Sequence, residues 1–308
     1  MTGGTQSSTG DGSIPMPPAR TTGPVADLHC KMRVATWNVM SLSGTGYQKA
    51  LVCELARLNI SIAGITEARL PGSDCCRVDS ALMLHSGGDQ HTNGVALLAR
   101  PPFDKALTSW KRISDRLLLA RFVHKHGHLS VIVAYAPTEP SGTDDKDLFY
   151  NQLSAVIQTI SPHDSVTILG DFNAVSGIHD NGCNVVGPFG SGSPNDNSDR
   201  LVSYCSMHDL TITGSWFRRL NIHRHTWISH DGVTKKEVDH ILTRSRDKSL
   251  FLSSEHVVAP KLRLTPTTSL LSRKCASRPT NQESSRAQQG SSIQHVSCRS
   301  LLSSCGIT

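Results

Sequence analysis

The sequence predicts an α/β fold, in which strands and helices alternate along the chain. Met32 to Val39 is rich in β-branched residues with apolar alternation, which indicates a strand that ends at Asn38. Residues 47–58 place apolar side chains at helical spacing, and residues 60–65 form a second apolar run. A strand, a helix and a strand within about 35 residues are typical of α/β proteins.

Further apolar runs, separated by polar turns, predict the later strands. A helix is expected over 146–160, capped by Asp144 or Asp145, and a shorter one over 199–208. The long helix should bury Leu148, Phe149, Leu153, Val156 and Ile157, and the further strands are expected at 94–99, 117–123, 129–135, 166–169 and 210–213.

The remaining segments are expected to be loops, one hairpin and two tails. Residues 175–198 are rich in Gly, Asn and Ser and predict a long surface loop. Residues 226–229 and 237–242 are expected to pair as strands across the turn at Asp231-Gly232. The predicted organisation is a disordered leader at 1–30, one domain at 31–264 and a disordered Ser-rich tail at 265–308.

Charge and composition exclude several classes of protein. The 31 Lys and Arg against 25 Asp and Glu give a formal charge of +6, which permits a nucleic-acid partner without requiring one. The nine cysteines form no CxxC pair, which argues against a zinc ribbon and a secreted disulfide scaffold. Neither a signal peptide nor a long apolar run is present, so we expect an intracellular protein that does not contact membranes. A monomer is also expected.

The stretch Gly170-Asp171-Phe172-Asn173 carries the first chemical signal. The chain is expected to leave its strand at Gly170 and to present Asp171 and Asn173 on one side, with Phe172 turned into the core. A carboxylate and an amide at a strand end suit a hydrated divalent cation, because hard cations prefer oxygen ligands. A strand followed by an Asx turn is an equally good interpretation of this stretch alone.

Polar residues at other strand ends complete a pattern that resembles a known superfamily. The pattern runs Thr-Trp-Asn at 36–38, Glu67, Tyr135-Ala-Pro, Gly-Asp-Phe-Asn at 170–173, Thr226-Trp227, Val-Asp-His-Ile-Leu at 238–242 and Glu255-His256. In this order it resembles the endonuclease/exonuclease/phosphatase superfamily. Between the motifs, the sequence looks most like the apurinic-type endonuclease domain of RTE (BovB-type) LINE retrotransposons and the craniofacial development protein 2 group.

The resemblance, which covers about 31–264, implies a four-layered α/β sandwich of two packed mixed β-sheets flanked by helices. It also implies phosphodiester hydrolysis of DNA at one rim, with Mg²⁺ or Mn²⁺ as the cofactor. By position, Glu67 would be the principal metal ligand, supported by Asn38, with Glu255 as a further metal-site residue. A nuclear location is expected from the substrate.

The same resemblance implies roles for five further residues. Asp171 would align or deprotonate the attacking water, and Asn173 would help to place it. The phenol of Tyr135 would stabilise charge near the phosphate. His256 would contact the scissile phosphate, with its ring oriented by Asp239.

The closing motif departs from the superfamily. Ser254-Glu255-His256 replaces the usual Ser-Asp-His, and only 16 residues separate Asp239 from Glu255. Glu reaches one methylene further than Asp, and a displacement of about an ångström would cost about 10²-fold in activity. A weakened or inactive endonuclease is therefore one expectation. The alternatives are a non-catalytic domesticated domain that binds nucleic acid or protein, and a phosphoesterase for lipid or inositol phosphates.

Cationic and aromatic residues after 215 are candidate DNA contacts. Arg218, Arg219, Arg224 and Trp227 would contact phosphates or bases. A solvated basic face is an equally good interpretation of the arginines, and core or rim packing is the favoured one for Trp227. Packing is the favoured interpretation for His240 within its strand and for Trp110 and Trp216, whereas a core aromatic is an equally good interpretation of Tyr135. A zinc site at Cys205, His223 and His225 has no standard spacing.

Overall fold

The computed structural model describes residues 32–89, 92–124, 127–179, 183–220, 224–229, 231–258 and 292–298, and the side chains of 252–258 and 292–298 lie outside the description. The three α-helices of these ranges are α1 (Tyr47–Arg57), α2 (Thr143–Thr159) and α3 (Asp196–Met207). Short 3₁₀ turns occur at Phe103–Lys105, Thr213–Trp216 and Ser245–Leu250.

Two large β-sheets contain most of the strands. The first sheet has the order β14-β15-β1-β2-β5-β4-β3 and the second β10-β13-β9-β8-β7-β6. The first contains β1 (Met32–Asn38), β2 (Ile62–Thr66), β3 (Ser73–Val78), β4 (Ala81–Ser86), β5 (Val95–Ala99), β14 (Phe251–Val258) and β15 (Ser292–Cys298). The second contains β6 (Leu107–Ser114), β7 (Leu117–His124), β8 (Gly127–Tyr135), β9 (Ser165–Asp171), β10 (Leu210–Ile212) and β13 (Asp239–Arg244), and a separate ribbon is formed by β11 (Trp227–Ile228) and β12 (Lys235–Lys236).

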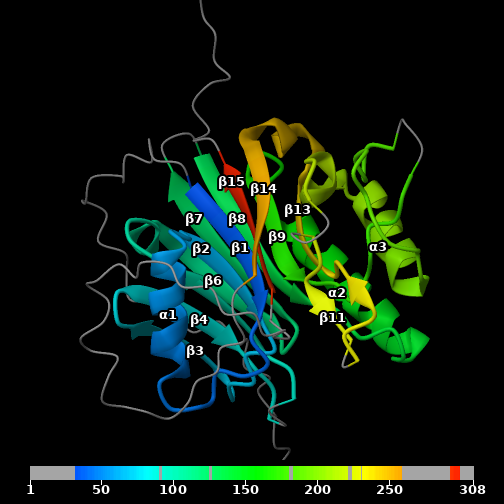
Figure 1. The fold of residues 1–308 in the computed structure, drawn as a ribbon. Helices are drawn as coiled ribbons and strands as arrows, with labels where there is room; N and C mark the ends of the chain where they lie inside the picture. Colours follow the sequence, from blue (N-terminus) through cyan, green and yellow to red (C-terminus); the bar gives the residue numbers. More distant parts are fainter. Residues whose placement is uncertain are drawn as a thin grey trace, which may run out of the picture.

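The two sheets pack face to face and helices cover their outer faces (Figure 1). In Figure 1, α1 lies outside the first sheet, and α2 and α3 lie outside the second. The parallel pairs β1–β2 and β8–β9 are each joined through a helix, α1 or α2, as a crossover connection requires. The predicted four-layered α/β sandwich of two mixed sheets is therefore confirmed.

The two sheets approach each other closely at Gly64. Gly64 of β2 faces Leu169 of β9, and a Cβ added at Gly64 would lie 2.6 Å from the Cβ of Leu169. Any side chain at Gly64 would force the sheets apart. An apolar layer fills the space between the sheets, and its members Leu97, Val133, Leu169 and Ile241 are fully buried.

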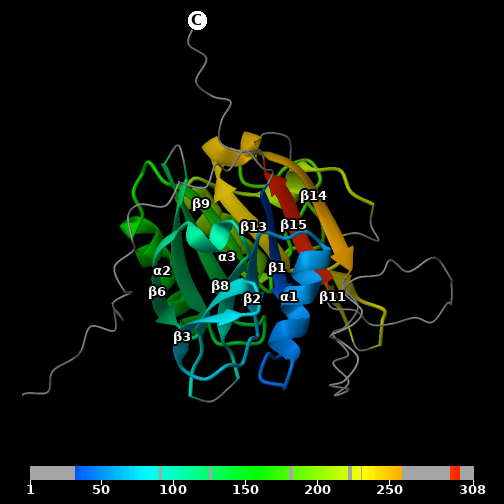
Figure 2. The same ribbon diagram turned by 90° about the vertical axis from the view of Figure 1, so that its left-hand side faces the viewer.

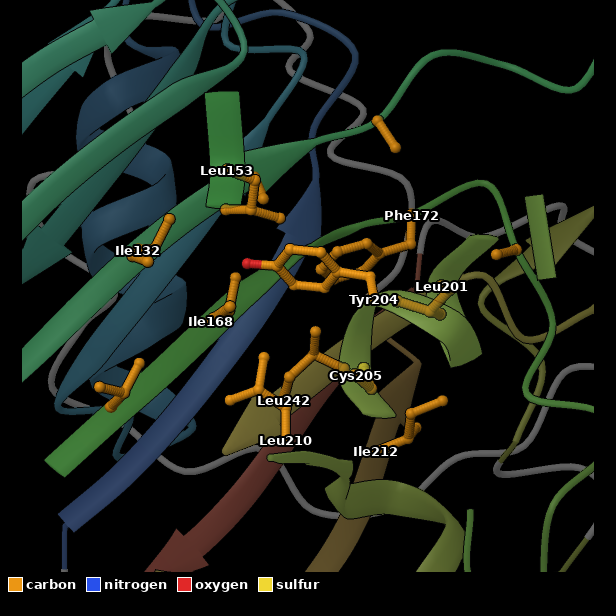
Figure 3. Packing of buried hydrophobic residues seen from close by; sticks show 14 of the residues in the cluster. Ile132, Leu153, Ile168, Phe172, Leu201, Tyr204, Cys205, Leu210, Ile212 and Leu242 are labelled. Atoms are coloured by element: carbon orange, nitrogen blue, oxygen red, sulfur yellow. The ribbon is translucent and has the colours of Figure 1, made fainter. Parts of the chain in front are cut away.

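The helices of the second sheet cover a separate apolar cluster. Figure 3 shows Phe172, Leu201 and Tyr204 packed between α3 and the sheet, beside Leu153 of α2 and Ile168 of β9. Phe172 is fully buried, as predicted for the residue between Asp171 and Asn173. The cluster therefore anchors the chain immediately after β9 through the buried Phe172.

Three helix predictions were wrong in detail. Helix α2 begins at Thr143 after the N-cap Gly142, and no side chain caps it. Leu148 is 58% exposed, because the face of α2 that meets the sheet is carried by Phe149, Leu153 and Val156. Helix α3 begins at Asp196, three residues early, because the Asn195 side chain accepts a hydrogen bond from the Ser198 amide at 3.0 Å.

The strand predictions also needed correction. Strand β9 continues through Gly170 to Asp171, because a glycine there lets the Ala134 carbonyl approach closely. The 226–229 segment pairs only with Lys235–Lys236 around the turn, whereas β13 joins β9 and β10. Strands β3, β4 and β6 were not predicted. For β3 and β6 the reason is that they lie at sheet edges and carry polar residues on much of their length.

The segment Ser292–Cys298 lies within the predicted disordered tail but forms β15. It pairs antiparallel with both β14 and β1, so it separates these two strands (Figure 2). Backbone pairing with a strand on each side stabilises β15, although the local sequence does not predict a strand here. The predicted leader lies outside the described residues. Within the described ranges, no helix combines the length and the apolar character that a membrane crossing would need.

Candidate functional site

The first sheet brings two of the predicted residues to one edge. Asn38 is the last residue of β1 and is in register with Thr66, the last residue of β2. Glu67 follows directly, with a left-handed backbone at φ 52°. The Asn38 Nδ2 donates to Glu67 Oε1 at 2.8 Å. Parallel pairing of β1 and β2 thus places an amide and a carboxylate side by side.

The second sheet presents three residues in a row at the same rim. Tyr135 ends β8, Asp171 ends β9 and Asp239 begins β13. Strand register aligns Tyr135 with Asp171, and Asp171 with Asp239. A phenol and two carboxylates therefore lie on adjacent strands, although more than a hundred residues of chain separate the first from the last.

Hydrogen bonds join the two sheets at this rim. The Asn38 Nδ2 also donates to Asp171 Oδ2 at 3.1 Å, and the Tyr135 hydroxyl donates to Glu67 Oε1 at 3.3 Å. Each bond crosses from one sheet to the other. We call the residues Asn38, Glu67, Tyr135, Asp171 and Asp239 the rim cluster.

Asn173 lies beside the rim cluster but is turned away from it. Its backbone N–H donates to Asp171 Oδ1 at 2.9 Å, which is an Asx turn, and its side-chain Nδ2 donates to the Ala136 carbonyl at 3.0 Å. The expectation that Asp171 and Asn173 point the same way assumed a continuing strand. The left-handed backbone of Asn173, at φ 48°, ends that alternation. The turn nevertheless orients Asp171.

Burial dominates the electrostatics of the acidic residues. Burial raises the pKa of Asp171 to about 6, hydrogen bonds from Asn173 and Asn38 lower it, and the charge of Glu67 raises it. Burial also raises the pKa of Asp239 well above its ordinary value, and the charge of Asp171 adds to this. The two carboxylates therefore destabilise each other's charged form.

The Tyr135 phenol remains protonated in this environment. Burial raises its pKa, and the charges of Glu67 and Asp171 raise it further. The guanidinium of Arg116 lies over the Tyr135 ring at 5.0 Å and opposes part of this shift. A protonated phenol can donate a hydrogen bond to an anionic oxygen, which is the role predicted for Tyr135.

The rim cluster fits a hydrated divalent cation. Asp239 Oδ1 is buried without a hydrogen-bond partner, and Glu67, Asp171 and Asp239 together bring three carboxyl groups to one rim. Among the described residues, no three His, Cys, Asp or Glu side chains converge as a preassembled cage. A closed cage is not required, because Mg²⁺ uses one or two carboxylates and keeps several waters.

Two of the predicted DNA-contacting arginines pair with Glu237. The Arg219 side chain is 4% exposed and its Nη2 lies 2.5 Å from Glu237 Oε1. Arg224 Nε lies 3.6 Å from Glu237 Oε2, and its Nη2 donates to the Phe189 carbonyl. The structure therefore places the Arg219 side chain in the interior, paired with Glu237, rather than on the surface where a phosphate contact was expected.

Other candidates remain on the surface or in the core. Arg218 is exposed, and Trp227 is 46% exposed on the β11–β12 ribbon, so both stay available to a partner. His240 is buried and its Nε2 lies 2.8 Å from the Ala174 carbonyl, which agrees with a packing role. Cys205 is also buried, while His223 lies outside the described residues.

The closing motif is placed only through its backbone. Glu255 and His256 lie on β14, where His256 is in register with Gln294 of β15, which is in register with Thr36. Strand β15 therefore lies between them and Asn38. Their side chains lie outside the described part of the chain, so their roles remain predictions.

The sandwich agrees with comparisons to solved structures. The endonuclease domain of TRAS1, a telomere-specific non-LTR retrotransposon, superposes with TM-score 0.54 and 13% identity over 88% of this chain and 99% of that one. The 3' phosphatase NExo from Neisseria, bound to a product DNA hairpin, gives TM-score 0.57 and 16% identity over 87% and 99%. The chain thus has the endonuclease/exonuclease/phosphatase fold.

One sequence relative indicates a more specific group than the fold alone does. The chain is 30% identical over 223 residues to craniofacial development protein 2 of Bos taurus, and we identify it as a homologue of that protein. The match covers 72% of this chain but only 37% of the relative, so the chain spans just over a third of the relative's length. No protein-family model matches the sequence.

Proposed function

We propose that this chain is a divalent-cation-dependent DNA endonuclease of retrotransposon origin. The observation that carries the proposal is the rim cluster, in which Asn38 bonds to both Glu67 and Asp171 across two sheets. The fold shared with the TRAS1 endonuclease domain supports the retrotransposon origin. The DNA hairpin in the NExo structure supports DNA as the substrate, and a nuclear location follows from that substrate.

The residues of the rim cluster divide the chemistry between them. Glu67 and Asn38 would hold Mg²⁺, or Mn²⁺ in its place, and the cation would neutralise the negative charge of the phosphate. Asp171, oriented by Asn38 and by the Asn173 amide, would align a water molecule and accept its proton. The protonated phenol of Tyr135 would donate a hydrogen bond to a phosphate oxygen.

Nicking of supercoiled plasmid by the full 308-residue chain tests this function. We expect open-circle product with Mg²⁺ and none with EDTA. Glu67→Gln and Asp171→Asn should each lower the rate by about 10²- to 10⁴-fold, since each removes a charge that the reaction needs. Asp79→Asn is the matched control, because Asp79 is exposed and lies in the β3–β4 turn.

A folded wild-type protein that does not nick in either buffer would contradict the endonuclease function. The second candidate, a non-catalytic nucleic-acid-binding domain, is favoured by Glu255 in the closing motif and by β15 between β14 and β1. Retained affinity for plasmid DNA without Mg²⁺-dependent product would identify this alternative. Affinity that falls steeply with salt would indicate phosphate contacts.

A further inference from the structure

A three-residue segment at the rim carries two opposite charges. Glu67 and Arg69 are separated by one residue, and Arg69 Nη2 lies 2.7 Å from Glu67 Oε2. The Arg69 side chain is 41% exposed and that of Glu67 is 17% exposed. The predicted principal cation ligand is therefore already occupied by a cation that belongs to the chain.

Glu67 has donors on both carboxylate oxygens. Oε1 accepts hydrogen bonds from Asn38 Nδ2 at 2.8 Å and from the Tyr135 hydroxyl at 3.3 Å, while Oε2 accepts from Arg69. The Oε1 donors are held by other contacts, because Asn38 also bonds Asp171 and Tyr135 is almost completely buried. Arg69 has the longest side chain of the three donors, and this side chain is 41% exposed, so solvent can reach it.

The backbone of this segment is held in place. Glu67 and Arg69 both have φ 52°, a left-handed conformation that is uncommon outside glycine. The Ala68 and Arg69 amides donate to the carbonyls of Gly94 and Asn93, each at 2.9 Å. The backbone therefore resists change, and release of Glu67 by Arg69 must occur by rotation of the arginine side chain.

We propose that Arg69 is a built-in competitor of the divalent cation at Glu67. Its guanidinium neutralises Glu67 when no cation is bound, and a cation that binds Oε2 must displace it. This inference rests on the proposed function, because it assigns the cation to Glu67. The competition lowers cation affinity, so it sets the cation concentration at which the site becomes occupied.

Direct Mn²⁺ binding to the full chain tests this proposal. Isothermal titration, or the electron paramagnetic resonance signal of unbound Mn²⁺, would give the Kd for wild type, Arg69→Gln and Arg69→Lys. We expect Arg69→Gln to bind Mn²⁺ about ten-fold more tightly, the scale expected when a positive charge leaves the neighbourhood of a divalent ion in a wet site. Arg69→Lys keeps the charge and should stay within about two-fold of wild type.

Two controls separate competition from other effects. Arg57 forms a similar exposed pair with Glu54 at 2.5 Å on α1, so Arg57→Gln should leave the Kd unchanged. Glu67→Gln combined with Arg69→Gln in a double variant should remove the gain in Mn²⁺ affinity that Arg69→Gln alone produces. If Arg69 only orients Glu67, Arg69→Gln and Arg69→Lys would both bind equally or more weakly than wild type, which overturns the proposal.

The outcomes also distinguish this inference from the endonuclease function. Plasmid nicking by wild type together with unchanged Mn²⁺ affinity in Arg69→Gln would overturn the competition alone. Tighter Mn²⁺ binding in Arg69→Gln without nicking by any variant would support the competition and contradict the endonuclease. Absence of Mn²⁺ binding in every variant would overturn the competition.

Discussion

Two arginine–glutamate pairs flank the strands of the rim cluster, and they differ mainly in burial. Arg69–Glu67 lies at the solvent edge, whereas both members of Arg219–Glu237 are buried. The buried pair has additional partners: Arg219 Nη2 donates to the Gly214 carbonyl at 3.2 Å, and the Ser191 hydroxyl donates to Glu237 at 3.2 Å. Glu237 therefore connects two loops to the segment that leads into Asp239.

Burial determines what each pair can do. A buried ion that loses its partner keeps the full cost of desolvation, so Arg219 and Glu237 must stay paired in the folded state. The Arg69 side chain is 41% exposed, so its guanidinium can exchange Glu67 for water at a lower cost than the buried Arg219 could exchange Glu237. Identical chemical groups thus produce a permanent anchor in one place and an exchangeable contact in the other.

The largest loss of unfolding free energy is expected at the buried Arg219–Glu237 pair. Arg219→Ala leaves Glu237 buried and without its closest partner, and should lower the free energy of unfolding by about 3–5 kcal/mol. Urea unfolding followed by circular dichroism measures this loss. The adjacent, exposed Arg218 is the matched control, and Arg218→Ala should cost less than about 0.5 kcal/mol. Equal losses in the two variants would contradict the importance of burial.

An intermediate loss of unfolding free energy is expected at the Arg121–Asp164 pair, in which only Asp164 is buried. Asp164 is buried and accepts bonds from Arg121 Nε at 2.7 Å and Nη2 at 3.0 Å. The hydrogen bond from Arg121 lowers the pKa of Asp164 below its ordinary value, although burial opposes this. Asp164→Asn should therefore cost about 1.5–3 kcal/mol at about pH 7.

The sign of the pH dependence follows from the lowered pKa. The stabilisation by Asp164 is fully present above the pKa of an unfolded Asp, about 4, and is lost as the pH falls through the lower pKa of the folded state. The difference in unfolding free energy between wild type and Asp164→Asn should therefore shrink below about pH 4. A constant difference down to about pH 2 would show that Asp164 is not a charged partner of Arg121.

The smallest effect is expected at the exposed pair on α1. Arg57 and Glu54 are three residues apart, and the Arg57 side chain is 61% exposed. Arg57→Ala should lower the unfolding free energy by about 0.2–0.5 kcal/mol, and added salt should reduce the difference. The same urea titration at low and high salt measures this. A loss comparable to that of Arg219→Ala would mean that burial does not determine how much each ion pair contributes to the free energy of unfolding.

Much of the fold could be predicted because local patterns agree with the tertiary structure. The strands that end at Asn38, Tyr135 and Asp171 were all identified from apolar runs followed by polar residues. Edge strands such as Ser73–Val78 were missed, because an edge strand exposes one side and carries polar residues without an apolar run. Strand β15 was missed because its backbone partners lie far away in the sequence.

The candidate site was predicted in part for the same reason. Residues at strand ends were identified individually, and the structure brings Asn38, Glu67, Tyr135, Asp171 and Asp239 to one rim. Arg69 was not identified, although it lies two residues after Glu67. A charged residue in a loop has no periodicity that would indicate its partner, so only coordinates could assign it to Glu67.

The sequence by itself determined which residues end strands and which chemistry those ends can support, because strand propensity and polar termination are local properties. Tertiary structure alone decided which strand ends meet and which charges are buried. Arg218 and Arg219 are adjacent and chemically identical, yet one is exposed and the other is paired with Glu237 in the interior. The physical reason is that burial and pairing depend on contacts between segments distant in sequence, whose free energies no local pattern contains.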